Sequence, residues 1–255
     1  MPTPSLRTEN LTIRFGGHVA VDHVTCAFQP GELTVIVGPN GAGKTTWFNL
    51  VSGQLKPSEG KVFKGEHDIT GQSPSARAKA GIGRAFQLTN LFPKLSVLEN
   101  VRLVVQARRG VGPRALSRAA ALTDIRDEAM GYLESARLAD VADYPAAALP
   151  HGDQRKLEVA MLIAMQPDIF MFDEPTAGMS VDEAPVILDL IAAIKKDMAK
   201  TILLVEHKMD VVRALADRII VLHNGELVAD GKPDEVMALP IVREIYLGVG
   251  AEDEE

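Results

Sequence analysis

The sequence Leu33-Thr34-Val35-Ile36-Val37-Gly38-Pro39-Asn40-Gly41-Ala42-Gly43-Lys44-Thr45-Thr46 decides the fold. Its nearly continuous apolar start predicts a strand in a sheet that is covered on both faces. The stretch from Gly38 to Thr45 matches G-x-x-x-x-G-K-[ST] at every fixed position, and a helix is expected to follow. In such a loop, backbone N–H groups surround phosphates, the lysine reaches the β- and γ-phosphates, and the hydroxyl binds Mg²⁺. We therefore predict that Gly38–Thr46 binds ATP, with Lys44 on the phosphates and Thr45 on Mg²⁺.

A second apolar strand, Ile169-Phe170-Met171-Phe172, ends in two carboxylates, Asp173 and Glu174. An acidic residue at a strand end holds the Mg²⁺ shell in phosphate-loop NTPases, and we expect Asp173 to do so. Glu174 is expected at the carboxyl edge of the sheet, where ligands bind in α/β folds. From there it can act as the general base on the attacking water. Acidic strand ends are common, so this assignment depends on the phosphate loop.

Composition limits the class of protein. The chain has 255 residues, a formal net charge of -7 and a pI of about 5.4. That length suits one α/β domain with a smaller lobe. The negative net charge argues against nucleic acid as a partner. The single cysteine, Cys26, excludes an intramolecular disulfide and is expected as a buried thiol in a strand. We find no signal peptide or apolar run of membrane-spanning length, so we expect a cytoplasmic chain that reaches a membrane through partners.

The pattern of the remaining segments predicts an α/β core with two additions. Strands expected at 169–172, 201–205 and 219–222 alternate with helices at 184–196 and 211–216, which indicates a parallel sheet. Asn224-Gly225 is a hairpin signal at its edge. Antiparallel strands are expected at 11–15, 21–28, 60–63 and 66–69.

Residues 96–143 predict a helical lobe. Helical spacing places Leu98, Val101 and Val105 on one face, and Leu122, Ile125, Ala129, Leu133 and Ala136 on another. Arg108 to Pro113 breaks the two helices apart, and its arginines suit either a solvated face or an anionic partner. We therefore predict one domain over 1–255, with core and antiparallel lobe at 5–87 and 160–255 and a helical insertion at 88–159.

Five elements in order resemble the ATP-binding cassette (ABC) superfamily along nearly the whole chain. They are the phosphate loop, Gln87, Leu149-Pro150-His151-Gly152-Asp153-Gln154, Asp173-Glu174-Pro175-Thr176 and His207. Each is weak alone, and their order makes the match specific. The resemblance implies a P-loop NTPase fold with a parallel core sheet, an antiparallel β subdomain and an inserted α-helical subdomain.

The resemblance also implies roles. Gln87 would touch Mg²⁺ and the attacking water, and His207 would sense the γ-phosphate. Phe15 would lie against adenine, although a core position in the hairpin is the rival interpretation. Two cassettes would close head-to-tail on two ATP molecules, so that Gly152 of one chain meets the ATP of the other, and Ala177–Ser180 would cross that interface.

Finer features resemble the importers of branched-chain amino acids. These features are Gly83-Arg84-Ala85-Phe86-Gln87, the stretch 90–100, Leu157-Glu158-Val159-Ala160 and Ile245-Tyr246-Leu247-Gly248. ATPases of urea importers share much of this pattern and remain an alternative. The family implies two integral-membrane permease subunits, a second ATPase that is identical or distinct, and an external solute-binding protein. The chain would then lie on the inner face of the cell membrane.

The signature-like segment departs from the family. The usual signature is Leu-Ser-Gly-Gly-Gln, and here Pro150 replaces the serine while His151 replaces the first glycine. Proline offers neither a hydroxyl nor a backbone N–H to phosphate. A weakly hydrolysing nucleotide-dependent switch is therefore a second hypothesis, which Glu174 and His207 oppose. A soluble ABC ATPase of DNA repair or translation is a third, disfavoured by the single cassette without a long insertion.

Overall fold

The computed structural model describes residue 3 and residues 5–85, 91–111 and 119–247. The chain divides into two compact units, which are described separately. The first comprises residues 1–84, 168–174 and 195–255, and the second comprises residues 85–167 and 175–194. The limits predicted for the helical insertion, 88–159, stay a prediction.

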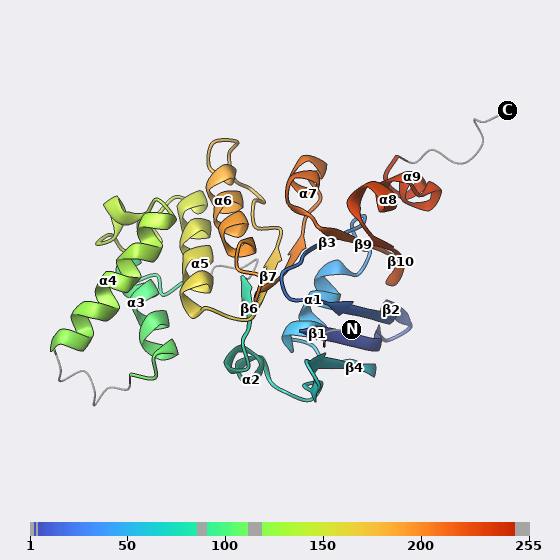
Figure 1. The fold of residues 1–255 in the computed structure, drawn as a ribbon, viewed down its shortest axis with the longest axis horizontal. Coiled ribbons are helices and arrows are strands. Elements are labelled where there is room, and N and C mark those ends of the chain that lie inside the picture. The colour runs from blue at the N-terminus through green and yellow to red at the C-terminus, as the bar shows by residue number, and fades with distance from the viewer. Residues whose placement is uncertain (1–2, 4, 86–90, 112–118, 248–255) are drawn as a thin grey trace. The chain divides into compact units, whose positions relative to one another are not determined.

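A six-stranded sheet forms the first unit's centre (Figure 1). Its strands run in the order β10 (Glu226–Gly231), β9 (Arg218–His223), β3 (Leu33–Val37), β8 (Thr201–Val205), β7 (Ile169–Asp173) and β6 (Ile82–Ala85). β3 pairs in parallel with β8 and β9, β7 pairs in parallel with β8, and β10 is antiparallel to β9. The parallel core and the hairpin at Asn224-Gly225 are confirmed. Because β3, β7 and β8 are parallel, their carboxyl ends meet at one edge.

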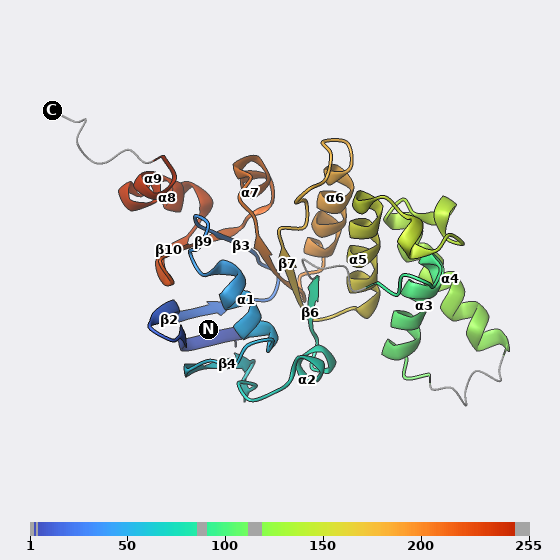
Figure 2. The same ribbon diagram turned by 180° about the vertical axis from the view of Figure 1, so that it is seen from behind.

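A four-stranded antiparallel sheet completes the first unit, in the order β2 (His18–Phe28), β1 (Leu6–Phe15), β4 (Glu59–Lys64) and β5 (His67–Asp68). Helix α1 (Lys44–Ser52) lies between this sheet and the six-stranded one in both Figure 1 and Figure 2. Trp47 of α1 is buried against Phe28 of β2 and against Phe48, with ring centroids 5.6 and 5.8 Å away. Burial of these rings joins both sheets into one apolar core. Cys26 belongs to this core, and burial raises its pKa to about 12, as expected of a structural thiol.

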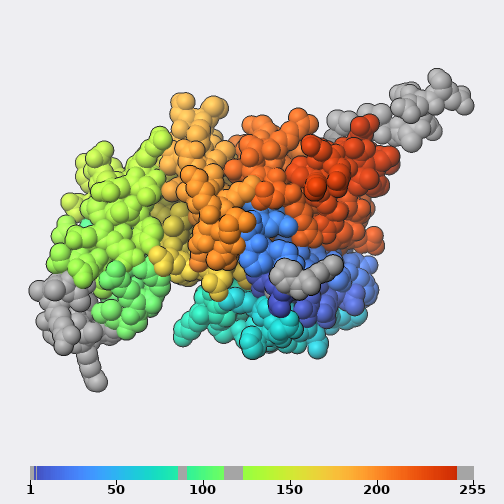
Figure 3. Space-filling view, viewed as in Figure 1, coloured from blue at the N-terminus to red at the C-terminus, as the bar shows by residue number. Residues whose placement is uncertain are grey.

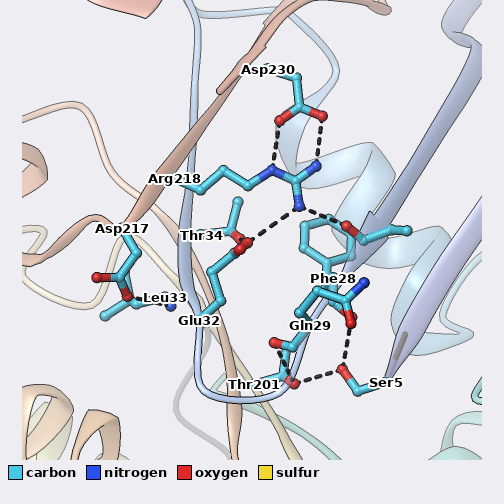
Figure 4. Close-up of polar contacts among 11 residues, drawn as sticks. Ser5, Phe28, Gln29, Glu32, Leu33, Thr34, Thr201, Asp217, Arg218 and Asp230 are labelled. Carbon is cyan, nitrogen blue, oxygen red and sulfur yellow. Dashed lines mark hydrogen bonds and ion pairs between the residues drawn. The ribbon is translucent and has the colours of Figure 1, made fainter. Parts of the chain in front are cut away.

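Arg218 of β9 ties the two sheets together at their edge (Figure 4). Its guanidinium donates to both carboxylate oxygens of Asp230 on β10, each at 2.6 Å, and to the Ala27 carbonyl of β2 at 2.6 Å. A further bond reaches Glu32, and the group lies 5.6 Å from the centroid of Phe28. The bonds to Asp230 raise the pKa of Arg218. Figure 3 shows the blue N-terminal and red C-terminal parts of this unit side by side, in keeping with the contact of β2 and β10.

Short helices complete the first unit. They are α2 (Pro74–Lys79), α7 (Met209–Leu215), α8 (Pro233–Ala238) and α9 (Pro240–Leu247). Arg77 of α2 is 1% exposed and donates to the carbonyls of Leu50 and Val51 at the end of α1, and to that of Thr70. It therefore donates to carbonyl groups of the last turn, which a helix leaves short of partners, and the Leu50 carbonyl also accepts the N–H of Gly53. Burial lowers its pKa to about 10.

The second unit is helical. Helices α3 (Val97–Arg108), α4 (Ala119–Ser135) and α5 (His151–Met165) contact one another, and this unit also holds most of α6 (Ala184–Lys195). Two 3-10 turns, η2 (Ala139–Val141) and η3 (Ala146–Ala148), connect α4 to α5. The predicted apolar faces are confirmed for the described side chains, because Leu98, Val101, Val105, Ile125, Ala129, Leu133 and Ala136 are all buried.

The arginines at the end of α3 have partners inside this unit. Arg108 donates to the Ala164 carbonyl of α5 at 2.8 Å and pairs with Glu128 of α4, which also binds Arg109. Arg108 therefore links three helices, and the expectation of a solvated face is wrong for this residue. Within the described residues, no helix has both the length and the apolar character required to cross a bilayer.

Candidate functional site

The phosphate loop connects β3 to α1, and two of its glycines are required by packing. Gly38 and Gly43 have φ values of 149° and 94°. A Cβ on Gly38 would lie 2.1 Å from the Leu222 carbonyl oxygen of β9, and one on Gly43 would lie 2.4 Å from that of Ala20 in β2. The loop is also held from behind, because the Ala42 carbonyl accepts the N–H of Gly225 at 3.1 Å. Its backbone is therefore fixed before any ligand binds.

Lys44 begins α1 and folds back over this loop. Its ammonium donates to the carbonyls of Gly38 and Pro39 at 2.7 and 2.8 Å, and the residue is 8% exposed. Burial lowers the pKa of Lys44, and the charges of Glu174 and Asp173 oppose that change. A phosphate at the loop would thus find a cation already placed at the N-terminus of a helix, where anions bind well. Thr45 and Thr46 are half-buried in the first turn of α1.

Asp173 ends β7 and is completely buried. Its Oδ2 accepts a hydrogen bond from Arg84 of β6 at 2.9 Å. Arg84 also donates to Asn49 and Ser52 of α1, at 2.6 and 2.9 Å. Burial lowers the pKa of Arg84, although Asp173 acts in the opposite direction. This arrangement ties the carboxylate of β7 to the helix that carries Lys44 and Thr45.

Glu174 and His207 face each other across neighbouring strand ends. Glu174 follows β7 with φ at 47°, and its N–H donates to the Val205 carbonyl of β8 at 3.0 Å. His207 follows β8, and its Nδ1 lies 4.0 Å from Glu174 Oε1. Its position is set in part by buried Glu206, whose carboxylate accepts the backbone N–H groups of His207 and Lys208. The His207 side chain is 55% exposed, so this end of the sheet is open to a ligand.

The segment predicted as the signature lies in the second unit, at the start of α5. Pro150 is the N-cap residue, with φ at -54° and ψ at 156°. Proline has no side-chain oxygen, so it cannot cap the helix as serine does. Gly152 is buried, and a Cβ there would lie 2.3 Å from a carboxylate oxygen of Glu183. Arg155 ties α5 to the segment after Glu174 by donating to the Pro175 carbonyl at 3.2 Å.

The first unit thus brings together Lys44, Thr45, Asp173, Glu174 and His207 at one end of the core sheet. Phe15 lies at the end of β1 and is 50% exposed, so it is not a core residue of the hairpin. Gln87 falls outside the described residues. The chemical roles assigned to these residues stay predictions.

Arg84 and Glu206 are two functional residues whose parts do not follow from the motifs of the sequence. Arg84 was noted as part of the stretch before Gln87, without a partner of its own. A charged residue in a short strand next to the acidic strand was the available signal, because a buried cation requires a counter-charge. Glu206 directly precedes His207, and no motif in the sequence indicates its part.

The donor set suits Mg²⁺ better than a transition metal. Thr45 contributes a hydroxyl and Asp173 a carboxylate, and oxygen ligands are those that Mg²⁺ prefers. Among the described residues, no group of three or more His, Cys, Asp or Glu side chains is placed to hold a metal ion. Mg²⁺ commonly takes further ligands from water and from nucleotide phosphates.

Comparison with known proteins identifies the family. The profile described as "ABC transporter" matches residues 21–177, which include the phosphate loop, the segment 149–154 and the strand end at Asp173-Glu174. The chain belongs to the ABC transporter family. ATP hydrolysis is the activity of this family, and the chain is an ABC ATPase that binds nucleotide.

Curated ABC proteins match along nearly their entire length. The branched-chain amino-acid transport ATP-binding protein LivG of Salmonella typhimurium is 37% identical over 253 residues, which cover 97% of this chain and 99% of LivG. LivG of Escherichia coli is 36% identical with the same coverage. BraF of Pseudomonas aeruginosa, described as a high-affinity transport ATP-binding protein for the same solutes, is 35% identical over 255 residues, covering 97% of this chain and 99% of BraF.

Solved ABC cassettes share the fold. A nucleotide-free cassette superposes with a TM-score of 0.80 at 30% identity, covering 97% of this chain and 99% of that one. The ADP conformation of the cassette MJ1267 also gives a TM-score of 0.80 at 30% identity, with coverages of 97% and 100%. The cassette MJ0796, as a dimer bound to ADP and Pi, gives 0.77 at 28% identity, with coverages of 89% and 98%.

Proposed function

We propose that this ABC ATPase powers an amino-acid importer, above all one for branched-chain amino acids. The observation that carries the proposal is the sequence identity of 35–37% to LivG and BraF over nearly the full length of the chain. The names of these relatives specify branched-chain amino-acid transport. Urea transport was the alternative on sequence grounds, and the names of these relatives favour amino acids over it. The partners of this function are two integral-membrane permeases, a second ATPase subunit and an external solute-binding protein, with this chain on the inner face of the cell membrane.

The residues at the sheet edge suit hydrolysis of the γ-phosphate bond. Lys44 holds the β- and γ-phosphates, while Glu174 accepts a proton from the water that attacks the γ-phosphorus. His207 lies 4.0 Å from the Glu174 carboxylate and donates to the γ-phosphate. Thr45, Asp173 and Gln87 would hold Mg²⁺, which would neutralise charge on the phosphate oxygens. Phe15, half exposed at the end of β1, covers the adenine ring.

A weakly hydrolysing switch is a second candidate, and Pro150 is the observation that favours it. In the composite site of a closed pair, Gly152 and its neighbours at the start of α5 meet the ATP of the opposite chain. Gly152 keeps its N–H there, but proline supplies no donor at the preceding serine position. Such a chain would still bind ATP and pair, while its turnover would be slow.

Uptake in the cell of origin tests the transport proposal. Deletion of the gene should abolish high-affinity uptake of labelled leucine, and the parent chain should restore it. Lys44→Ala and Glu174→Gln should fail to restore it, although both proteins accumulate normally. Retained leucine uptake with loss of urea uptake would show that the solute assignment is wrong.

A further inference from the structure

The contact between Arg84 and Asp173 has a consequence for metal binding. Asp173 is completely buried, and the Arg84 side chain is 6% exposed. A buried carboxylate is costly without a counter-charge, and here a guanidinium donates to it at 2.9 Å. The other nearby cation, Lys44, acts on Asp173 by charge, but its ammonium donates to Gly38 and Pro39.

Arg84 is also fixed in place from a second side. Its Nη1 donates to Asn49 Oδ1 at 2.6 Å and to Ser52 Oγ at 2.9 Å, and its guanidinium carbon lies 5.6 Å from the Phe48 ring centroid. All three residues belong to α1, the helix that begins at Lys44. A guanidinium held by a carboxylate, an amide, a hydroxyl and a ring has little freedom to swing away when a ligand arrives.

We propose that Arg84 is the resident counter-charge of Asp173, which balances the carboxylate when no metal is bound and weakens the hold of Asp173 on Mg²⁺. When the metal binds, Asp173 contacts both the Arg84 guanidinium and Mg²⁺. The repulsion between these two positive charges lowers the affinity of the site for Mg²⁺. Release of Mg²⁺ with ADP after hydrolysis becomes easier in consequence. Arg84 is a positioning residue, and this inference rests on the proposed role of Asp173 as a Mg²⁺ ligand.

The test measures how Mg²⁺ promotes binding of a fluorescent ADP analogue (mant-ADP) to the purified full chain. In Arg84→Met the Mg²⁺ concentration at half-maximal binding should fall several-fold, because the competing charge is gone. Arg84→Gln keeps a hydrogen-bond donor but lacks the positive charge, so its Mg²⁺ concentration at half-maximal binding should also fall. Arg84→Lys keeps the charge and should stay near the parent.

Thermal unfolding gives a second readout and a matched control. In EDTA, the Arg84→Met variant should melt at a lower temperature than the parent. Addition of Mg²⁺ and ADP should raise the melting temperature of this variant by more than it raises that of the parent. The double variant Arg84→Met/Asp173→Asn lacks the buried negative charge of Asp173. In EDTA it should therefore melt at a higher temperature than the Arg84→Met single variant. Arg218→Met breaks a more exposed arginine–aspartate pair, with Asp230, in the same sheet. It should lower stability with and without Mg²⁺, and leave the Mg²⁺ midpoint unchanged.

The outcomes separate cleanly. A parent chain that does not bind mant-ADP with Mg²⁺ contradicts the proposed nucleotide site itself. If the parent binds, an unchanged Mg²⁺ concentration at half-maximal binding in Arg84→Met would show that Arg84 is purely structural. A higher Mg²⁺ concentration at half-maximal binding would show that Arg84 promotes binding of the metal. Either result overturns the counter-charge role. If the variants are unfolded in EDTA, the proposal requires that Mg²⁺ with ADP, and not ADP alone, restores the fold.

Discussion

Glu174 is held in an unusual backbone conformation at the point where the chemistry is expected. Its φ of 47° lies in the left-handed region, which non-glycine residues seldom adopt, and its N–H is bound to Val205 of β8. The backbone bond joins the residue to the strand that leads to His207. Strain of this kind persists where surrounding structure imposes it, often at functional sites.

We expect Glu174→Gln to bind ATP with nearly parental affinity and to lose most of its turnover. The amide keeps the size of the side chain but cannot accept a proton, and general-base catalysis contributes roughly 10²–10⁴-fold to rate. ATP binding and steady-state phosphate release on the same preparation measure both effects. Turnover near the parental rate would remove Glu174 from the role of base.

Pro150→Ser should raise ATP turnover by about tenfold to a hundredfold, since a hydrogen bond to a charged group is worth about 1.5–3 kcal/mol. The gain depends on the hydroxyl, because serine can both cap α5 and reach phosphate. Pro150→Ala is the matched control, since alanine restores the N–H without the hydroxyl. Equal rates in the parent and the serine variant would instead indicate that proline serves to rigidify the turn before α5, a position that suits it.

At the scale of elements, the segments with a continuous apolar run or a motif were the predictable ones. Strand β3 and the start of α1 followed from an apolar run and a glycine-rich motif, and β7 and β8 from buried apolar runs. Strand β6 and helices α2, α8 and α9 were not identified, because their sequences contain no comparable apolar run and their place depends on contacts distant in sequence. The pairing of Arg84 with Asp173 was unpredictable for the same reason, since they are far apart in the chain and meet only across β6 and β7.

Helix α1 depends on a residue outside it. Arg77→Met should lower the free energy of unfolding by about 1.5–3 kcal/mol, because carbonyls at the end of α1 lose a charged donor inside the protein. Urea denaturation monitored by Trp47 fluorescence measures the change, since that buried residue belongs to α1. Lys79→Met on the same short helix is the control, and its exposed side chain predicts no comparable loss. Equal effects of the two substitutions would show that the bonds from Arg77 to Leu50 and Val51 contribute little.

At the scale of the whole molecule, the residues predicted to contact ATP belong to different compact units. Lys44, Asp173, Glu174 and His207 belong to the first unit, whereas Pro150 and Gly152 belong to the second. The family resemblance predicts this division, because it places Gly152 on the ATP of another chain. No pattern within one sequence reveals which partner supplies that other chain.

We expect ATP to drive pairing of the chain. The Glu174→Gln variant with Mg²⁺ and ATP should appear as a dimer in light scattering, because slow hydrolysis preserves the closed state. Lys44→Ala in the same background should remain monomeric, since it weakens contact with the phosphates. A monomer in both variants would point to a distinct second ATPase or to the permeases as the missing requirement.

The close approach of β2 and β9 to the phosphate loop affects how this sequence can evolve. Gly38 and Gly43 are constrained by the Leu222 and Ala20 carbonyls as well as by any ligand. The parts proposed for Lys44 and Thr45 depend on the nucleotide, although Lys44 also donates to the Gly38 and Pro39 carbonyls. A descendant that abandoned ATP hydrolysis would therefore keep both glycines while drifting at the lysine and the threonine. Glycines that remain in such a copy would therefore indicate only that the loop keeps its shape. A retained lysine and threonine would indicate that the copy has kept ATP hydrolysis.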